Sequence, residues 1–450
     1  GFNDDGIIHR QLVSQRTITF IDERFKFLAR ELDSIEVNYQ KFKQQNRLVD
    51  ITSDVSIGLE QRNNSETELF QLEYQIELVK SLEASMNNQS RGELLPNNIG
   101  LENQGVNVFI MEDSYPSEAG INEWISGGKG NAETIAKNFS IVFWYCKEVV
   151  DLLEWMRNYN LNKPQEEQIR FYGMDIQNVK DINKEIRDLV KKFEIPVSEE
   201  LLLVADKCAE KKVAYNKPTD WADIQIPKLN EIKIILIDFK SKIKNQENIE
   251  EVISGIRALN YLSKYTYYIQ NNYSQDRDLK MFENVKWIVE NKSKNGKAFI
   301  WAHNEHINKK EMYYTGSGII NLGRHLKDYY KDEYYSVGFD FGIGKINGFM
   351  IDKKKGNHWK NYNIEKPFKR TYAKTLMSIN KDIYFIDLQK AIESDFSNFF
   401  SEKNKHLLVA SGGYQPKPLH KIMISKIYTE TYDGLIFVKE ISKPEYNLDK

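Results

Sequence analysis

The chain contains little cysteine, and this limits how it can be held together. Its 450 residues include two cysteines, Cys146 and Cys208. Two thiols cannot build a disulfide framework or a thiolate zinc site, and nothing in the sequence supports a single bridge. A chain of this length buries roughly three-quarters of its unfolded surface on folding, so its core needs no such cross-link.

Long apolar runs and an excess of one charge are also missing. No run of about 18 apolar residues occurs, so no segment is predicted to span a membrane. Lysine plus arginine number 63 and aspartate plus glutamate 65, which gives a formal net charge of -2. Because nucleic acids and anionic membranes bind basic surfaces, this balance argues against both as partners.

Three familiar motifs are absent as well. Without a Gly-x-Ser-x-Gly elbow, a standard α/β-hydrolase serine has no support. Without a Walker loop or a Gly-x-Gly-x-x-Gly fingerprint, nucleotide cofactors have none either, and we expect no cofactor. The chain begins at Gly1, which fits either a cleaved secretion signal or a trimmed chain. We expect a soluble protein that is either cytoplasmic or secreted. The sequence does not indicate its oligomeric state.

Short apolar runs alternate with helix-type patterns along most of the chain. Seven runs are predicted as buried strands, at 55–59, 106–111, 169–174, 297–302, 334–341, 383–388 and 434–438. Residues 178–290 carry long amphipathic stretches instead, which are typical of helices. The pattern predicts an α/β fold, a mostly parallel sheet covered by helices with an inserted helical lobe. The predicted parts are 1–177, which starts with a helical segment, 178–290 and 291–450.

Polar side chains directly follow four of the predicted strands. They are Glu60, Gln61 and Asn64, then Glu112 and Asp113, then Asp175 and Gln177, then His303, Asn304 and His306. Ligands bind outside the carboxyl ends of parallel strands, so we expect the four groups to converge on one cleft that takes a small-molecule substrate. Solvated loops explain any one group, but less well two of only seven histidines at one strand end.

His303 and His306 are the leading candidates for chemistry, since three-residue spacing puts them on one face of a helical turn. Imidazoles transfer protons near neutral pH. Metal ligation together with Glu112 or Asp175 is the alternative, for which His-x-x-His is a weak signal. Glu112 leaves an apolar strand, so we expect burial to raise its pKa and suit it to act as a base or to orient a histidine; an N-cap or ion pair is equally compatible.

Asp175 and Arg277 have two readings each. A carboxylate at the position of Asp175 more often ties down a loop through backbone N–H groups than contacts substrate. Arg277 could bind a substrate oxyanion. An ion pair of Arg277 with Asp276, Asp278 or another acid fits equally well.

Six segments resemble the erythromycin esterase family. They are INEWISGG at 121–128, EVVDLLEWMRNYN at 148–160, FYGMDIQ at 171–177, RDLKMFENVKWI at 277–288, WAHNEH at 301–306 and YDGLIFV at 432–438. In order and spacing they cover most of the chain from about 50 to 440, and some bacterial members are labelled succinoglycan biosynthesis proteins. The resemblance implies an α/β lobe, a helical lobe and a deep cleft between them. It also implies hydrolysis of a macrolide lactone by water that a histidine activates, without a metal.

The family's signature after its first strand, Gly-Glu-x-Thr/Ser-His-Gly, is altered here. Aligned on ELFQL, Gln61 falls at the Glu position and Asn64 at the position of the His that is the expected base. A one-residue gap gives Glu60 and Asn63 instead, so neither alignment recovers a histidine. The basic residue that the family often has nine positions later is replaced by Glu73. Four other positions match, namely Glu112, Arg277, His303 and His306.

Two main hypotheses follow, because an amide cannot accept a proton from water near pH 7. The first is a diverged hydrolase of an ester or lactone, with macrolides disfavoured as natural substrates, in which His303 or His306 activates water. Glu112 then orients that histidine and Arg277 stabilises an anionic intermediate. The remaining candidates for substrate contacts are Asp175, Asn304, Asn64, Gln61 and Glu73. The second is a binding homologue that has lost the chemistry, and a metal-dependent hydrolase is a third, weaker option.

Overall fold

The structure is a computed structural model that describes residues 105–210, 220–270, 276–311, 319–350, 358–407 and 423–445. The chain divides into two compact units, residues 1–106 and 107–450. The second unit contains all the helices and strands that the structure describes. The strand predicted at 55–59 and the candidates Gln61, Asn64 and Glu73 lie outside the described residues.

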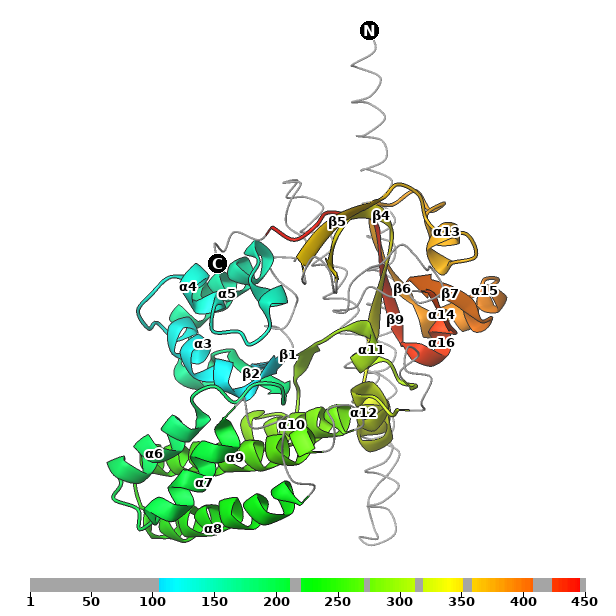
Figure 1. Cartoon of the computed structure of the whole chain (residues 1–450). Coiled ribbons are helices and arrows are strands. Elements are labelled where there is room, and N and C mark those ends of the chain that lie inside the picture. The colour runs from blue at the N-terminus through cyan, green and yellow to red at the C-terminus, as the bar shows by residue number, and fades with distance from the viewer. Residues whose placement is uncertain are drawn as a thin grey trace, which may run out of the picture. The chain divides into compact units, whose positions relative to one another are not determined.

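Three parallel strands form the first sheet, in the order β2-β1-β3 (Figure 1). They are β1 (Val108–Ser114), β2 (Arg170–Asp175) and β3 (Phe299–Trp301), all within or next to predicted strands. Parallel pairing brings their carboxyl ends to one edge. Met111 of β1 is level with Gly173 and Trp301, so Glu112 leaves the pleat between the ends of both neighbours.

Helices pack on one face of this sheet and along one of its edges. Val108 and Ile110 pack on one face with residues of α10 (Arg277–Lys292) and α12 (Leu322–Tyr330). α3 (Glu118–Ile125) lies along the edge of β2 that does not pair with β1, where its Asn122 side chain bonds the backbone N–H and C=O of Phe171. Successive side chains of a strand point to opposite faces, and residues 108–111 are all buried, so both faces of β1 are covered and the strand is apolar along most of its length.

A helical layer lies between β2 and β3 in the sequence, within the predicted helical segment 178–290. Its members are α6 (Ile182–Lys192), α7 (Glu199–Ala209), α8 (Trp221–Lys242) and α9 (Gln246–Gln270), and α10 follows them. The first four pack side by side (green in Figure 1) around one apolar core that includes Ile186, Leu236 and Leu259. The division of the chain into lobes stays a prediction.

The second sheet has four strands in the order β5-β4-β9-β6. Their bounds are Val337–Met350 for β4, His358–Ile364 for β5, Ile383–Asp387 for β6 and Gly434–Ile441 for β9. β4 and β9 are parallel, while β5 and β6 are antiparallel to their neighbours. The α/β class is confirmed. β5 was not predicted, because HWKNYNI has no apolar run.

Short elements complete the region around this sheet. α13 (Tyr372–Leu376), α14 (Leu388–Ile392), α15 (Ser397–Ser401) and α16 (Tyr428–Thr431) share its apolar core. β7 (Asn404–Leu407) and β8 (Met423–Lys426) form a separate antiparallel pair. Between α3 and β2 lie α4 (Ala132–Ala136) and α5 (Lys147–Leu161).

Both cysteines lie in the described part of the chain. Cys146 and Cys208 are both buried thiols. Within the described ranges, no helix has the length and apolar character that crossing a bilayer would require.

A buried ion pair joins the helical layer to the first sheet. Arg257 of α9 pairs with Glu118 of α3, with Nη2 2.6 Å from Oε1. The two side chains are 12% and 8% exposed. Glu118 also accepts the backbone N–H of Gly173 at 2.8 Å, and the guanidinium lies over the ring of Tyr115. The carboxylate of Glu118 therefore links α3, α9 and β2.

We expect Arg257→Met to lower the free energy of unfolding by about 3–5 kcal/mol, because Glu118 is left buried without a counter-ion. Urea denaturation measures the change. Arg187→Met is the control, since Arg187 pairs with acids that are themselves partly exposed and should cost about 0–1 kcal/mol. Equal effects of the two variants would show that burial of the Arg257 pair does not matter.

Candidate active site

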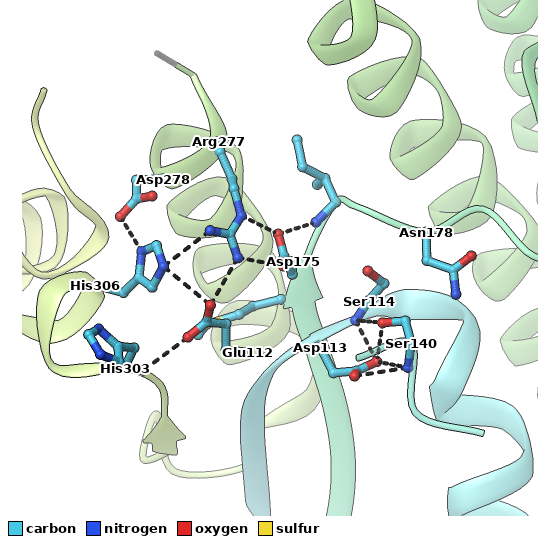
Figure 2. Close-up of polar contacts among 12 residues, drawn as sticks. Glu112, Asp113, Ser114, Ser140, Asp175, Asn178, Arg277, Asp278, His303 and His306 are labelled. Atoms are coloured by element: carbon cyan, nitrogen blue, oxygen red, sulfur yellow. Dashed lines mark hydrogen bonds and ion pairs between the residues drawn. The ribbon is translucent and has the colours of Figure 1, made fainter. Parts of the chain in front are cut away.

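Glu112 is the centre of a polar cluster at the carboxyl end of β1 (Figure 2). Its Oε1 lies 2.9 Å from Nη2 of Arg277 and 3.2 Å from Nε2 of His306. Its Oε2 accepts the backbone N–H of His303 at 2.9 Å. The structure therefore brings together four residues that are far apart in the sequence.

Arg277 is the first residue of α10, where the positive end of the helix dipole disfavours a cation. Two acids compensate. Nε and Nη2 of Arg277 donate to Asp175, at the end of β2, at 2.9 and 2.7 Å, and Nη2 also donates to Glu112. Asp175 also accepts the backbone N–H of Ile176. This contact ties down the loop after β2, which is one of the two roles that the sequence suggested for Asp175. Because Arg277 is held by protein carboxylates, its contacts match the ion-pair reading rather than an open oxyanion site.

His306 belongs to α11 (Asn304–Ile307) and lies buried between two carboxylates. Nδ1 is 2.8 Å from Asp278 Oδ2 and Nε2 is 3.2 Å from Glu112 Oε1. Asp278 also accepts the backbone N–H of Leu322. Nη1 of Arg277 lies 3.2 Å from the same Nε2. A ring with both protons satisfies both carboxylates, whereas a neutral ring accepting from Arg277 would leave one carboxylate facing it without a proton.

Electrostatics in the cluster differs from the expectation for Glu112. Burial alone would raise the pKa of Glu112, but the charges and hydrogen bonds of His306 and Arg277 outweigh burial and hold it well below its usual value. The predicted raised pKa is therefore wrong. For His306, burial alone would lower the pKa, but Glu112 and Asp278 raise it to about 10. His306 is a cation near neutral pH and cannot accept a proton from water there.

His303 has a different environment from His306. It is half-buried and caps the start of α11, where its Nδ1 accepts the backbone N–H of Glu305 at 3.2 Å. A neutral ring that accepts at Nδ1 carries its proton on Nε2. In this arrangement the imidazole of His303 is set to donate from Nε2 rather than to accept there.

α11 is also fixed from the side of the second sheet. The side-chain amide of Asn304 donates to the carbonyl of Phe339 at 2.6 Å and accepts its N–H at 3.0 Å, so it binds β4 backbone as a strand would. Glu305 forms a fully buried ion pair with Lys426 of β8. Lys426 also donates to the hydroxyl of Tyr432 at 2.9 Å. These contacts make Asn304 part of the support of the turn that carries both histidines.

Not every strand-end residue joins the cluster. Asp113 follows Glu112 in β1 and faces the opposite way, toward Ser140 and Ser114 (Figure 2). Burial raises the pKa of Asp113 to about 6 although the serines oppose this. Sequence reasoning missed Asp278 as the second partner of His306. Its position beside Arg277 was visible, but no spacing links it to a histidine 28 residues later.

Three of the four ring nitrogens of His303 and His306 contact protein groups. Both nitrogens of His306 face carboxylates, and Nδ1 of His303 faces an N–H group. In the part of the chain that the structure describes, no three His, Cys, Asp or Glu side chains are grouped to hold one ion. The geometry gives the metal-dependent hypothesis no donor set among these residues.

We expect the His306 ring to keep both protons until about pH 10. Its folded pKa lies above the ordinary 6.5, so its stabilisation of the fold is complete below about pH 6.5 and is lost as the pH rises through 10. Ring ¹⁵N chemical shifts measure the protonation directly. His325, whose pKa burial lowers, is the internal control and should lose its proton first. Titration of His306 near pH 6.5 would contradict the proposed charge.

Comparison with known proteins places the chain in a family. The erythromycin esterase family model matches residues 101–441. Erythromycin esterase type II from Escherichia coli is 24% identical over 325 residues, which are 65% of this chain and 76% of that protein. Residues 101–441, which the family model matches, contain the whole Glu112 cluster.

Solved structures share the fold. A Bacillus cereus protein has a TM-score of 0.63 at 20% identity, covering 78% of this chain and 84% of its own. A succinoglycan biosynthesis protein has a TM-score of 0.58 at 16% identity, covering 83% of this chain and 86% of its own. Identities this low carry the fold and no residue roles. Because the family model spans well over half of the sequence, this chain belongs to the erythromycin esterase family.

Proposed function

We propose that the protein is a hydrolase of an ester or lactone in which His303 transfers the proton. One observation carries the assignment of the residue: of the two histidines at the end of β3, His306 is buried between carboxylates and cationic, whereas His303 is half-buried. Membership of the erythromycin esterase family supports the reaction class. The proposal therefore assigns proton transfer to His303 and a structural role to His306.

The geometry suits a donor role for His303. Nε2–H would donate a hydrogen bond to the carbonyl oxygen and stabilise the negative charge that develops there as water adds to the carbonyl carbon. The ring keeps this proton, because a neutral imidazole that gave it up would become an anion. For proton transfer the ring would first release the N–H of Glu305 and carry its own proton on Nδ1. Nε2 would then take a proton from the attacking water and pass it to the departing alkoxide as the C–O bond breaks, which leaves the alcohol, the carboxylic acid and the neutral ring.

The other residues of the cluster hold His303 in position. Glu112 holds the backbone of His303 with one oxygen, while its other oxygen is fixed by Arg277 and His306. Three acids and two cations give the cluster a net charge of about -1 when His306 is protonated. This charge favours neutral or cationic substrates over anionic ones.

A binding homologue without turnover is the second candidate. Asn64 or Asn63 stands where the family has its expected base, and His306 is unsuited to replace that base. Such a protein would keep the cleft and lose the water-activating step. It predicts thermal stabilisation by the ligand without product.

We expect His303→Ala to reduce turnover of a responsive ester or lactone by about 10²–10⁴-fold, as the loss of a positioned proton donor does. Mass detection of products from a panel of simple esters, lactones and a macrolide is the assay. His325→Ala is the matched control and should retain full activity, since His325 lies on α12 outside the cluster.

The double variant Asn64→His with Gln61→Glu separates the two candidates. Turnover in the parent that His303→Ala abolishes supports the hydrolase. Turnover only in the double variant means that the parent is a binding homologue. Parent turnover that His303→Ala leaves unchanged would refute the role of His303.

A further inference from the structure

A second polar site lies between α9 and α10, away from the Glu112 cluster. It is a pocket of about 130 Å³ lined by Arg257, Asn260, Tyr261, Lys264, Glu283, Asn284 and Trp287. Four of these follow one face of α9 and three follow one face of α10, as i, i+3, i+4 and i+7 spacing requires. The pocket is therefore built by the packing of two long helices.

Lys264 is the group that gives the pocket its charge. Its side chain is 22% exposed, and Nζ lies 2.8 Å from Asn284 Oδ1 and 3.4 Å from Glu283 Oε2. Burial lowers the pKa of Lys264, and the nearby cations Lys280 and Arg257 lower it further. A buried ammonium in a cleft is costly unless it is fully compensated.

Glu283 does not fully compensate the ammonium of Lys264, because it also serves a second cation. Its Oε1 lies 2.8 Å from Nζ of Lys280. Arg257 is neutralised separately by Glu118. The three cations Lys264, Lys280 and Arg257 thus face two carboxylates, those of Glu283 and Glu118. These five groups together carry one surplus positive charge.

Two aromatic side chains, Tyr261 and Trp287, line part of the pocket. The guanidinium of Arg257 lies 4.7 Å from the centre of the Trp287 ring. The Tyr261 hydroxyl donates to the carbonyl of Asn178 at 2.8 Å, so that ring is held at its far end. A ligand that meets Lys264 with a charged group therefore has aromatic surface for the rest of its body.

We propose that this pocket binds a small monocarboxylate, with the carboxylate on Lys264 and a short alkyl chain against Trp287 and Tyr261. An engineered cavity of about 150 Å³ takes benzene, so 130 Å³ accommodates roughly five or six non-hydrogen atoms. One surplus positive charge matches a monoanion. A dianion such as phosphate would exceed that charge, and Glu283 would repel it about twice as strongly as a monocarboxylate.

The site stands independently of the proposed hydrolase. Asn284 anchors its floor to the sheet by donating to the carbonyl of Met174 at 2.8 Å. Arg277 lies seven residues earlier on α10, roughly 10 Å along the helix axis. Loss of the Glu112 chemistry would leave this pocket intact.

The test uses the full chain and butyrate as the probe, at constant ionic strength set with sodium chloride. The indole N–H resonance of Trp287, assigned with Trp287→Phe, reports binding by NMR. We expect a saturable shift with a dissociation constant of about 1–10 mM, weakened at least tenfold in Lys264→Met. Lys286→Met is the control and should bind like the parent, because Lys286 is on α10 but points to Glu290 and Tyr329.

Three results would overturn the proposal. They are a shift that does not saturate by about 100 mM, equal binding by Lys264→Met, and tighter binding of phosphate than of butyrate. Should Lys264→Met fail to fold, Asn260→Leu fills the same pocket and must weaken butyrate binding. Retained affinity in that variant would equally refute the site.

Discussion

The site depends on burying one carboxylate, that of Glu112, at the carboxyl end of β1. A buried charge must be compensated, and the two oxygens of Glu112 are bound by Arg277 of α10, His306 of α11 and the backbone N–H of His303, the N-cap of α11. Arg277 is in turn fixed by Asp175, and His306 by Asp278. Removal of any member leaves another buried charge without its partner, so the cluster behaves as a unit.

This unit explains which histidine is suited to chemistry. Two carboxylates around one imidazole make His306 a structural cation, a role that a strand-end histidine does not reveal by itself. His303, three residues closer to β3 in the sequence, gains its position from Glu112 and from its own cap on α11. The altered signature after the first strand then matters greatly, because the described residues do not include a second imidazole placed as a base.

Contacts with the second sheet hold α11, and contacts with the helical layer hold the first sheet. Asn304 and the Glu305–Lys426 pair tie α11 to the second sheet, and the Arg257–Glu118 pair ties α9 to the first. Both ion pairs are buried, and all three contacts join partners that are far apart in the sequence. The same packing of α9 on α10 leaves a pocket that Lys264, Glu283 and Trp287 help to line.

Sequence alone determined the α/β class, six of the described strands, the helical segment and the family, because apolar periodicity and local motifs are properties of neighbouring residues. It also singled out Glu112, Asp175, Arg277, His303 and His306. Tertiary structure decided their states: that Glu112 has a lowered rather than a raised pKa, that Arg277 is already paired, and that Asn304 binds β4. Protonation and pairing depend on which charges meet in space, and Asp278 meets His306 only after the chain has folded.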